Sequence, residues 1–379
     1  MKKKGLLFIL HPSAFILPEH PYLGGLNPVT APPLWLRRSL AAAAAVLALA
    51  AGLATARADD KKDVTVETVP YRGWQHNLRM TNGDAELLVT LDVGPRVLVY
   101  RFNGGKNVFK EFEDQLGKSG EKGWMARGGH RLWTAPEDLT RTYAPDNGPV
   151  KYEQLPVKKS GAVGVRFTPA PDSAYGVQRE MDVYLTDKGS RVEVVHRITN
   201  VGDKPADLAP WALTMMAPGG TEVLPLPPKR PHPGPPENAR SPADYAAQIH
   251  MALWPYFDFT DPRWHFGSRS ITLRQDANRG PTKIGFNNTL GWAGYWNGGT
   301  LFVKRYDYKE GQTYADGGCN CETFTNQEFL EMESMGPLVR LAPGAKVEHT
   351  EHWELHKDVP EFHDEADIAK HILPLVEGK

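Results

Sequence analysis

Two glutamates near the end of the sequence have a spacing that acid–base chemistry can use. Glu331 and Glu333 lie two residues apart in a run that reads as a β-strand. Their side chains should therefore project from one face, while the intervening apolar residues project from the other. Two carboxyls that share a partly buried face repel each other, which raises the pKa of one of them toward neutrality. The alternative is a pair of solvated acids on an amphipathic strand.

A second group of chemically capable residues follows two glycines. Gly128 and Gly129 precede His130 and Arg131, and a flexible turn of this kind brings side chains close to a ligand. Arg131 can donate a planar fork of N–H groups to hydroxyls or to a carboxylate. His130 has an ordinary pKa of about 6.5, which suits a general acid. In the alternative, Arg131 pairs with Glu137 and His130 only caps the turn.

Tryptophan is frequent, with ten residues in the chain, and indole faces suit the apolar C–H faces of sugar rings. Trp133, Trp254 and Trp264 each stand near Gly, Pro or Arg in a segment that reads as a loop. We predict that these three residues bind the sugar ring, together with Arg263, which precedes Trp264. Packing in the core is the alternative, since a buried indole removes roughly 150–250 Å² from water.

The sequence predicts neither a metal nor a cofactor. His352, in the alternating run 346–355, and His356, directly after it, fall on the polar face. This is typical of a solvated strand, whereas zinc sites converge three or four ligands. Cys319 and Cys321 are too close in sequence for a relaxed disulfide. The chain also lacks a P-loop, a dinucleotide fingerprint and a nucleophile elbow.

Consecutive β-strands must position these residues. From position 64 onward, short alternating runs are separated by Gly, Asn, Asp and Pro, which predicts strands joined by turns. The runs are 86–91, 96–100, 163–168, 180–185, 191–199, 271–274, 300–306, 322–325, 329–334 and 346–355. Helical periodicity is convincing only at 366–373. Because the strands do not alternate with long helices, the pattern excludes a parallel α/β sheet and predicts an all-β fold.

The first 58 residues read as a leader. Arg37 and Arg38 precede the uncharged stretch 39–56, and Ala56-Arg57-Ala58 supplies the small residues of a cleavage site. The stretch is mostly alanine and shorter than the roughly 20 apolar residues that span a bilayer. We therefore expect cleavage after Ala58 and export to the periplasm or the exterior, with membrane contact only through an uncleaved leader.

The overall charge bears on nucleic-acid binding. The 44 Lys and Arg residues against 45 Asp and Glu give a net charge of -1, so the concentrated basic surface of a nucleic-acid-binding protein is not predicted.

Eight prolines in the 19 residues 224–242 predict an extended loop. We interpret this loop as an insertion in one domain, 59–358, that precedes a helical tail, 359–379; a linker between two domains is the alternative.

Five segments, in this order, resemble the galactose mutarotase-like (aldose 1-epimerase) superfamily, and most closely one bacterial subgroup of it. The first is 87–101, with Gly94-Pro95-Arg96-Val97, and the second is 128–137, Gly-Gly-His-Arg-Leu-Trp-Thr-Ala-Pro-Glu. The third is the strand ending in Asn200; the fourth combines Leu-Trp-Pro-Tyr at 253–256 with Asp-Pro-Arg-Trp at 261–264; the fifth runs from 317 to 344. Together they span about residues 64–356.

The resemblance implies an all-β fold, a β-supersandwich of large antiparallel sheets whose concave face holds a sugar. It also implies a glutamate that takes the proton from the anomeric hydroxyl, and Glu331 or Glu333 matches its position. The family histidine that protonates the ring oxygen has no counterpart in the matching strand, 209–214. His130 is the proposed replacement.

These observations predict an exported carbohydrate-binding protein. Glu331, Glu333, His130 and Arg131 are expected to line one concave pocket with Trp133. A sugar epimerase, or a related enzyme that processes polysaccharide fragments, is one alternative. A structural envelope protein whose proline-rich loop binds a partner is the other. The sequence does not assign an oligomeric state.

Overall fold

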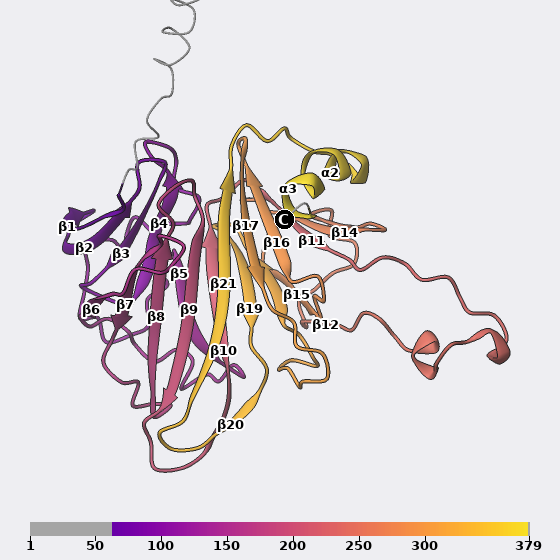
Figure 1. The fold of residues 1–379 in the computed structure, drawn as a ribbon, viewed down its shortest axis with the longest axis horizontal. Coiled ribbons are helices and arrows are strands. Elements are labelled where there is room, and N and C mark those ends of the chain that lie inside the picture. The colour runs from indigo at the N-terminus through magenta and orange to yellow at the C-terminus, as the bar shows by residue number, and fades with distance from the viewer. Residues whose placement is uncertain (1–62, 378–379) are drawn as a thin grey trace, which may run out of the picture. The chain divides into compact units, whose positions relative to one another are not determined.

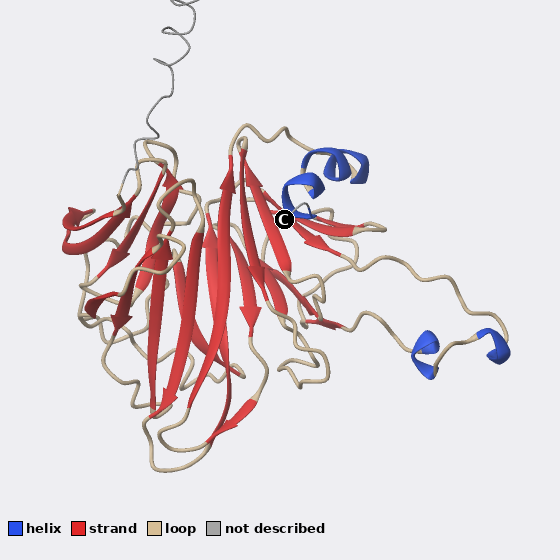
Figure 2. Ribbon diagram, in the orientation of Figure 1, coloured by secondary structure: helices blue, strands red, loops and turns tan. Residues whose placement is uncertain are grey.

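The computed structural model describes residues 63–377, and almost all regular structure in this range is β-strand (Figure 2). The strands form two large antiparallel sheets, so the predicted fold class is confirmed. The predicted leader, 1–58, lies outside the described residues. Among the residues that are described, no helix has both the length and the apolar content to cross a membrane.

The first sheet has eleven strands and contains the strands that carry Arg131, Trp133, Glu331 and Glu333 (Figure 1). In spatial order its strands are β1 (Thr65–Tyr71), β2 (Trp74–Thr81), β3 (Ala85–Thr90), β4 (Arg96–Phe102), β5 (His130–Ala135), β10 (Ala206–Met216), β19 (Leu330–Met335), β18 (Cys321–Thr325), β15 (Thr282–Phe286) and β12 (Met251–Leu253), while β20 (Val339–Leu341) pairs with the start of β10.

The second sheet has ten strands and packs against the first. Its order is β13 (Trp264–Phe266), β14 (Ser270–Arg274), β11 (Thr221–Pro225), β16 (Trp292–Asn297), β17 (Thr300–Tyr306), β21 (Lys346–His356), β9 (Val192–Asn200), β8 (Val177–Leu185), β7 (Val163–Thr168) and β6 (Lys151–Leu155).

The main core lies between the two sheets. Leu132 and Met332 of the first sheet join the same buried cluster as Phe302 and Trp353 of the second. Since side chains alternate along a strand, the neighbours of these core residues in β5, β10 and β19 point away from the second sheet. We call this side of the eleven-stranded sheet its outer face.

Two additions lie outside the sheets. Helices α2 (Glu365–His371) and α3 (Leu373–Glu377) pack their apolar residues on Val223, Leu301 and Val303 of the ten-stranded sheet. The proline-rich segment between β11 and β12 projects away from both sheets (Figure 1). Its two 3₁₀ turns, η1 (Pro236–Asn238) and η2 (Pro242–Tyr245), contain no buried residue. The segment leaves the sheet after Pro225, slightly later than the proline count predicts.

Candidate functional site

Three neighbouring strands bring the predicted residues onto the outer face. Leu213 of β10 lies opposite Arg131 of β5 on one side and opposite Glu333 of β19 on the other. Glu333 in turn lies opposite Glu322 of β18. This register places charged side chains from strands that are far apart in the sequence in a single row across the sheet.

The turn that precedes β5 determines the position of Arg131 in this row. Gly128 has φ +92°, and a Cβ atom at this position would lie 2.0 Å from the carbonyl oxygen of Lys110. Only glycine fits such a close backbone approach. The turn is therefore fixed by packing against the preceding segment, and β5 begins at His130 without a flexible loop.

Arg131 and Glu331 form a buried ion pair on this face. One Nη of Arg131 lies 3.2 Å from Oε1 of Glu331. The guanidinium also stacks over the rings of Trp133 and Trp124, at 4.2 and 5.2 Å from their centroids. Burial raises the pKa of Glu331 to about 7, although Arg131 opposes the shift and Glu333 adds to it. Glu331 thus has the pKa that a general acid or base needs near neutral pH.

Lys283 of β15 forms ion pairs with both carboxyls of the row. Its Nζ lies 2.7 Å from Glu322 and 3.0 Å from Glu333. Burial acts to lower the pKa of Lys283, but the two carboxyls outweigh it and the pKa is raised. The ammonium lies over the rings of Trp254 and Trp211, at 4.6 and 5.1 Å from their centroids. The indole N–H of Trp211 donates to Glu333.

We call this group the outer-face cluster. Its members are Trp124, Arg131, Trp133, Trp211, Trp254, Lys283, Glu322, Glu331 and Glu333. Two buried donors in it, the indole N–H of Trp124 and the Nε–H of Arg131, have no hydrogen-bond partner among the described residues. Since buried donors are normally satisfied, these two groups leave hydrogen-bonding capacity in the cluster that the described residues do not use.

The cluster adjoins open space. Tyr143 packs against Trp133 and Trp124, with ring centroids 5.3 and 5.4 Å apart. The same tyrosine borders a cleft of about 900 Å³ that is also lined by Thr140 of the loop between β5 and β6 and by Asp172 of the loop between β7 and β8. The cleft itself does not contain the charged row, so it adds room beside the cluster and is not its centre.

The structure separates His130 from the cluster. His130 and Arg131 are consecutive in β5, so their side chains point to opposite faces. The imidazole is fully buried between the sheets, and burial lowers its pKa well below the ordinary value. The prediction that His130 lines one pocket with Glu331 and Glu333 is therefore wrong in geometry, because the first two residues after the glycines form a strand and not a turn.

Trp264 and Arg263 also differ from expectation. Trp264 belongs to β13, is 7% exposed, and donates its indole N–H to Thr282 within the inter-sheet core. Its predicted loop position is wrong, because the segment pairs with β14. Arg263 is buried and forms an ion pair with Asp261 at 2.7 Å. Trp254, by contrast, is half-buried beside Lys283.

Four members of the cluster were not predicted: Trp124, Trp211, Lys283 and Glu322. Glu322 falls in a predicted strand in which side chains alternate between the two faces. The pairing of β18 with β19 then determines which face carries Glu322. No sequence pattern indicates Lys283, because β15 is short and its partner strand β18 begins about forty residues later.

Neither a protein-family model nor a curated protein matches the sequence. Among solved structures, a TPR-domain-containing protein from Parabacteroides distasonis has a TM-score of 0.50 at 15% identity, over 76% of this chain and 48% of that chain. The match thus spans about half of that protein's length.

Two galactose mutarotase-like proteins also match. The one from Clostridium acetobutylicum has a TM-score of 0.47 at 11% identity, over 78% of this chain and 99% of that chain. The one from Lactobacillus casei has a TM-score of 0.46 at 12% identity, over 74% and 100%. At these identities the likeness concerns the fold alone, and it agrees with the fold that the resemblance implies.

Proposed function

We propose that the outer-face cluster binds a carbohydrate. The observation that carries the proposal is the environment of Arg131: its guanidinium is fixed between Glu331 and two indole rings, while its Nε–H and the N–H of Trp124 have no hydrogen-bond partner within residues 63–377. Fixed donors beside carboxylates and aromatic faces match the alternating hydroxyl and C–H surfaces of a sugar. The galactose mutarotase-like fold supports the same class of ligand.

Trp254 provides the direct test, because it is a half-buried aromatic residue of the cluster. We expect Trp254→Ala to weaken sugar binding at least about 30-fold, as removal of a central aromatic contact at a binding site costs about 2 kcal/mol or more. Titration calorimetry with a panel of neutral sugars, uronates and oligosaccharides would measure this. Tyr152→Ala is the matched control, since Tyr152 is exposed on β6 of the other sheet. An absence of binding to every sugar by the unaltered protein would reject the proposal.

A sugar isomerase of the aldose 1-epimerase type is a second candidate. The pKa of Glu331, raised to about 7 by burial, suits removal of a proton from an anomeric hydroxyl. Ring opening also needs an acid at the ring oxygen, and His130 cannot serve because it faces the core. Binding without isomerisation is therefore the function that the geometry supports better.

Polarimetry on freshly dissolved α-sugars separates these two functions. We expect the observed rate of mutarotation to equal the spontaneous rate, even at protein concentrations that bind the sugar. A protein-dependent rate that Glu331→Gln abolishes would favour the isomerase instead. Export stays a prediction from the leader sequence.

A further inference from the structure

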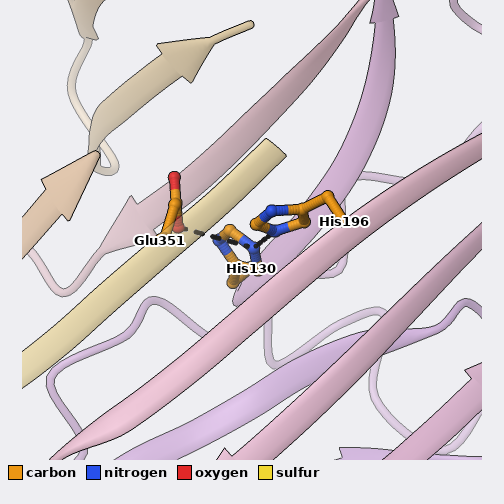
Figure 3. A group of neighbouring side chains, drawn as sticks. All are labelled: His130, His196 and Glu351. Carbon is orange, nitrogen blue, oxygen red and sulfur yellow. Dashed lines mark hydrogen bonds and ion pairs between the residues drawn. The ribbon is translucent and has the colours of Figure 1, made fainter. Parts of the chain in front are cut away.

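A second group of polar residues lies on the opposite side of β5, between the two sheets. His130 of β5, His196 of β9 and Glu351 of β21 are all fully buried. Their potential ligand atoms lie within 4.8 Å of one another, and Figure 3 shows the three side chains converging from different strands. The group is separate from the outer-face cluster and is not used by the function proposed above.

Both imidazoles are oriented through the ring nitrogen that faces away from the group. Nδ1 of His196 lies 2.9 Å from the carbonyl oxygen of His349. A carbonyl only accepts, so Nδ1 carries the proton and Nε2 keeps its lone pair. Nδ1 of His130 lies 2.8 Å from the hydroxyl of Thr214. The two Nε2 atoms face each other at 2.7 Å. Anchoring of one ring nitrogen by an oxygen atom is the usual arrangement of histidines that bind a metal through the other.

Glu351 is held in a similar way by groups outside the trio. Lys304 and Ser334 donate to Oε1 at 2.9 and 2.6 Å. Oε2 accepts from the indole of Trp353 at 2.8 Å and lies 3.9 Å from Nε2 of His130. Because Lys304 is directed to Oε1, Oε2 is the oxygen that faces the histidines.

We propose that Nε2 of His130, Nε2 of His196 and Oε2 of Glu351 bind a first-row divalent transition-metal ion such as Zn²⁺. Imidazole and carboxylate ligands suit this class of ion. Tetrahedral bonds of about 2.0–2.1 Å place ligand atoms about 3.3 Å apart. The two nitrogens, 2.7 Å apart, must therefore separate by about 0.6 Å, and Oε2 must approach Nε2 of His130 by a similar amount. The carboxylate and Nε2 of His196 lie within 4.8 Å of each other, so that pair closes by up to about 1.5 Å. The fourth position would be filled by a small ligand such as water.

The position of the site indicates a structural role. His130 comes from the eleven-stranded sheet, whereas His196 and Glu351 come from the ten-stranded sheet. A bound ion would join the two layers through the centre of the core. Because the ligands are inaccessible in the folded protein, the ion must be incorporated during folding, which couples its binding to stability.

Refolding of the unaltered, tag-free protein tests this proposal. The chain is unfolded in denaturant with a chelator and then refolded with or without equimolar Zn²⁺. We expect about one zinc per chain after gel filtration, by elemental analysis, and a Tm at least about 4 °C above that of the zinc-free sample. Co²⁺ should give the visible absorption of a four-coordinate ion without a thiolate band. No retained zinc and an unchanged Tm would overturn the proposal and leave a direct hydrogen bond between the two imidazoles.

Single substitutions test which residues bind the ion. His196→Gln should lower the retained zinc at least tenfold. His352→Gln is the matched control, because His352 is exposed on the outward side of β21, and it should retain about one zinc. Equal loss in both variants would assign the zinc to surface histidines and overturn the proposal. If His196→Gln does not refold, the stoichiometry, the Tm and the Co²⁺ spectrum of the unaltered protein still decide.

Discussion

Replacement of Lys283 by methionine should lower the free energy of unfolding by about 3–5 kcal/mol, the usual effect of removing one partner from a buried ion pair. Lys283 is 5% exposed and lies between Glu322 and Glu333. Methionine keeps most of the side-chain volume but no charge. The two carboxyls would then face each other across β18 and β19 in a buried environment, where each needs either a counter-charge or a proton.

Urea unfolding at pH 7 measures the effect of Lys283→Met. Lys122→Met is the control, because Lys122 is exposed and substitutions at such positions change stability by about 0.5 kcal/mol or less. Adding Glu333→Gln to Lys283→Met should recover part of the loss, since it removes one of the two unpaired carboxyls. A Lys283→Met protein within 1 kcal/mol of the unaltered one would show that the ion pairs do not stabilise the row.

Local sequence patterns predict about half of the described strands. The runs 163–168 and 300–306 coincide with β7 and β17, and the run 346–355 ends one residue before β21 does. These runs alternate clearly and end at turn residues, so local information is sufficient to find them. The same alternation correctly places Glu331 and Glu333 on one face of β19.

The errors come from information that is not local. The two preceding glycines predict a turn at His130, yet the contact that shapes this turn is with Lys110, and the strand starts immediately afterwards. A displacement of the strand register by one residue decides whether a side chain faces the core or the outer face. The cation that pairs with Glu333 could not be identified either, since Lys283 reaches it through the pairing of three strands.

Glu331→Gln should change how stability depends on pH. In the folded protein burial raises the pKa of Glu331 from 4.5 to about 7. Between these two values the unfolded chain has released the proton, while the folded protein still holds it. The folded state thus binds more protons, and stability falls as pH rises. The stabilising contribution is complete below about pH 4.5 and is lost above about pH 7; a shift of this size corresponds to roughly 3 kcal/mol.

The comparison of two pH values isolates this contribution. From pH 5 to pH 8, the free energy of unfolding of the unaltered protein should fall by about 2–3 kcal/mol more than that of Glu331→Gln, because all other titrating groups are common to both. Glu328→Gln is the control: Glu328 is exposed just before β19, and its variant should keep the pH dependence of the unaltered protein. Parallel curves for the unaltered protein and Glu331→Gln would mean that Arg131 keeps Glu331 ionised. The cluster would then offer a fixed ion pair to its ligand, and the isomerase candidate would lose its proton acceptor of neutral pKa.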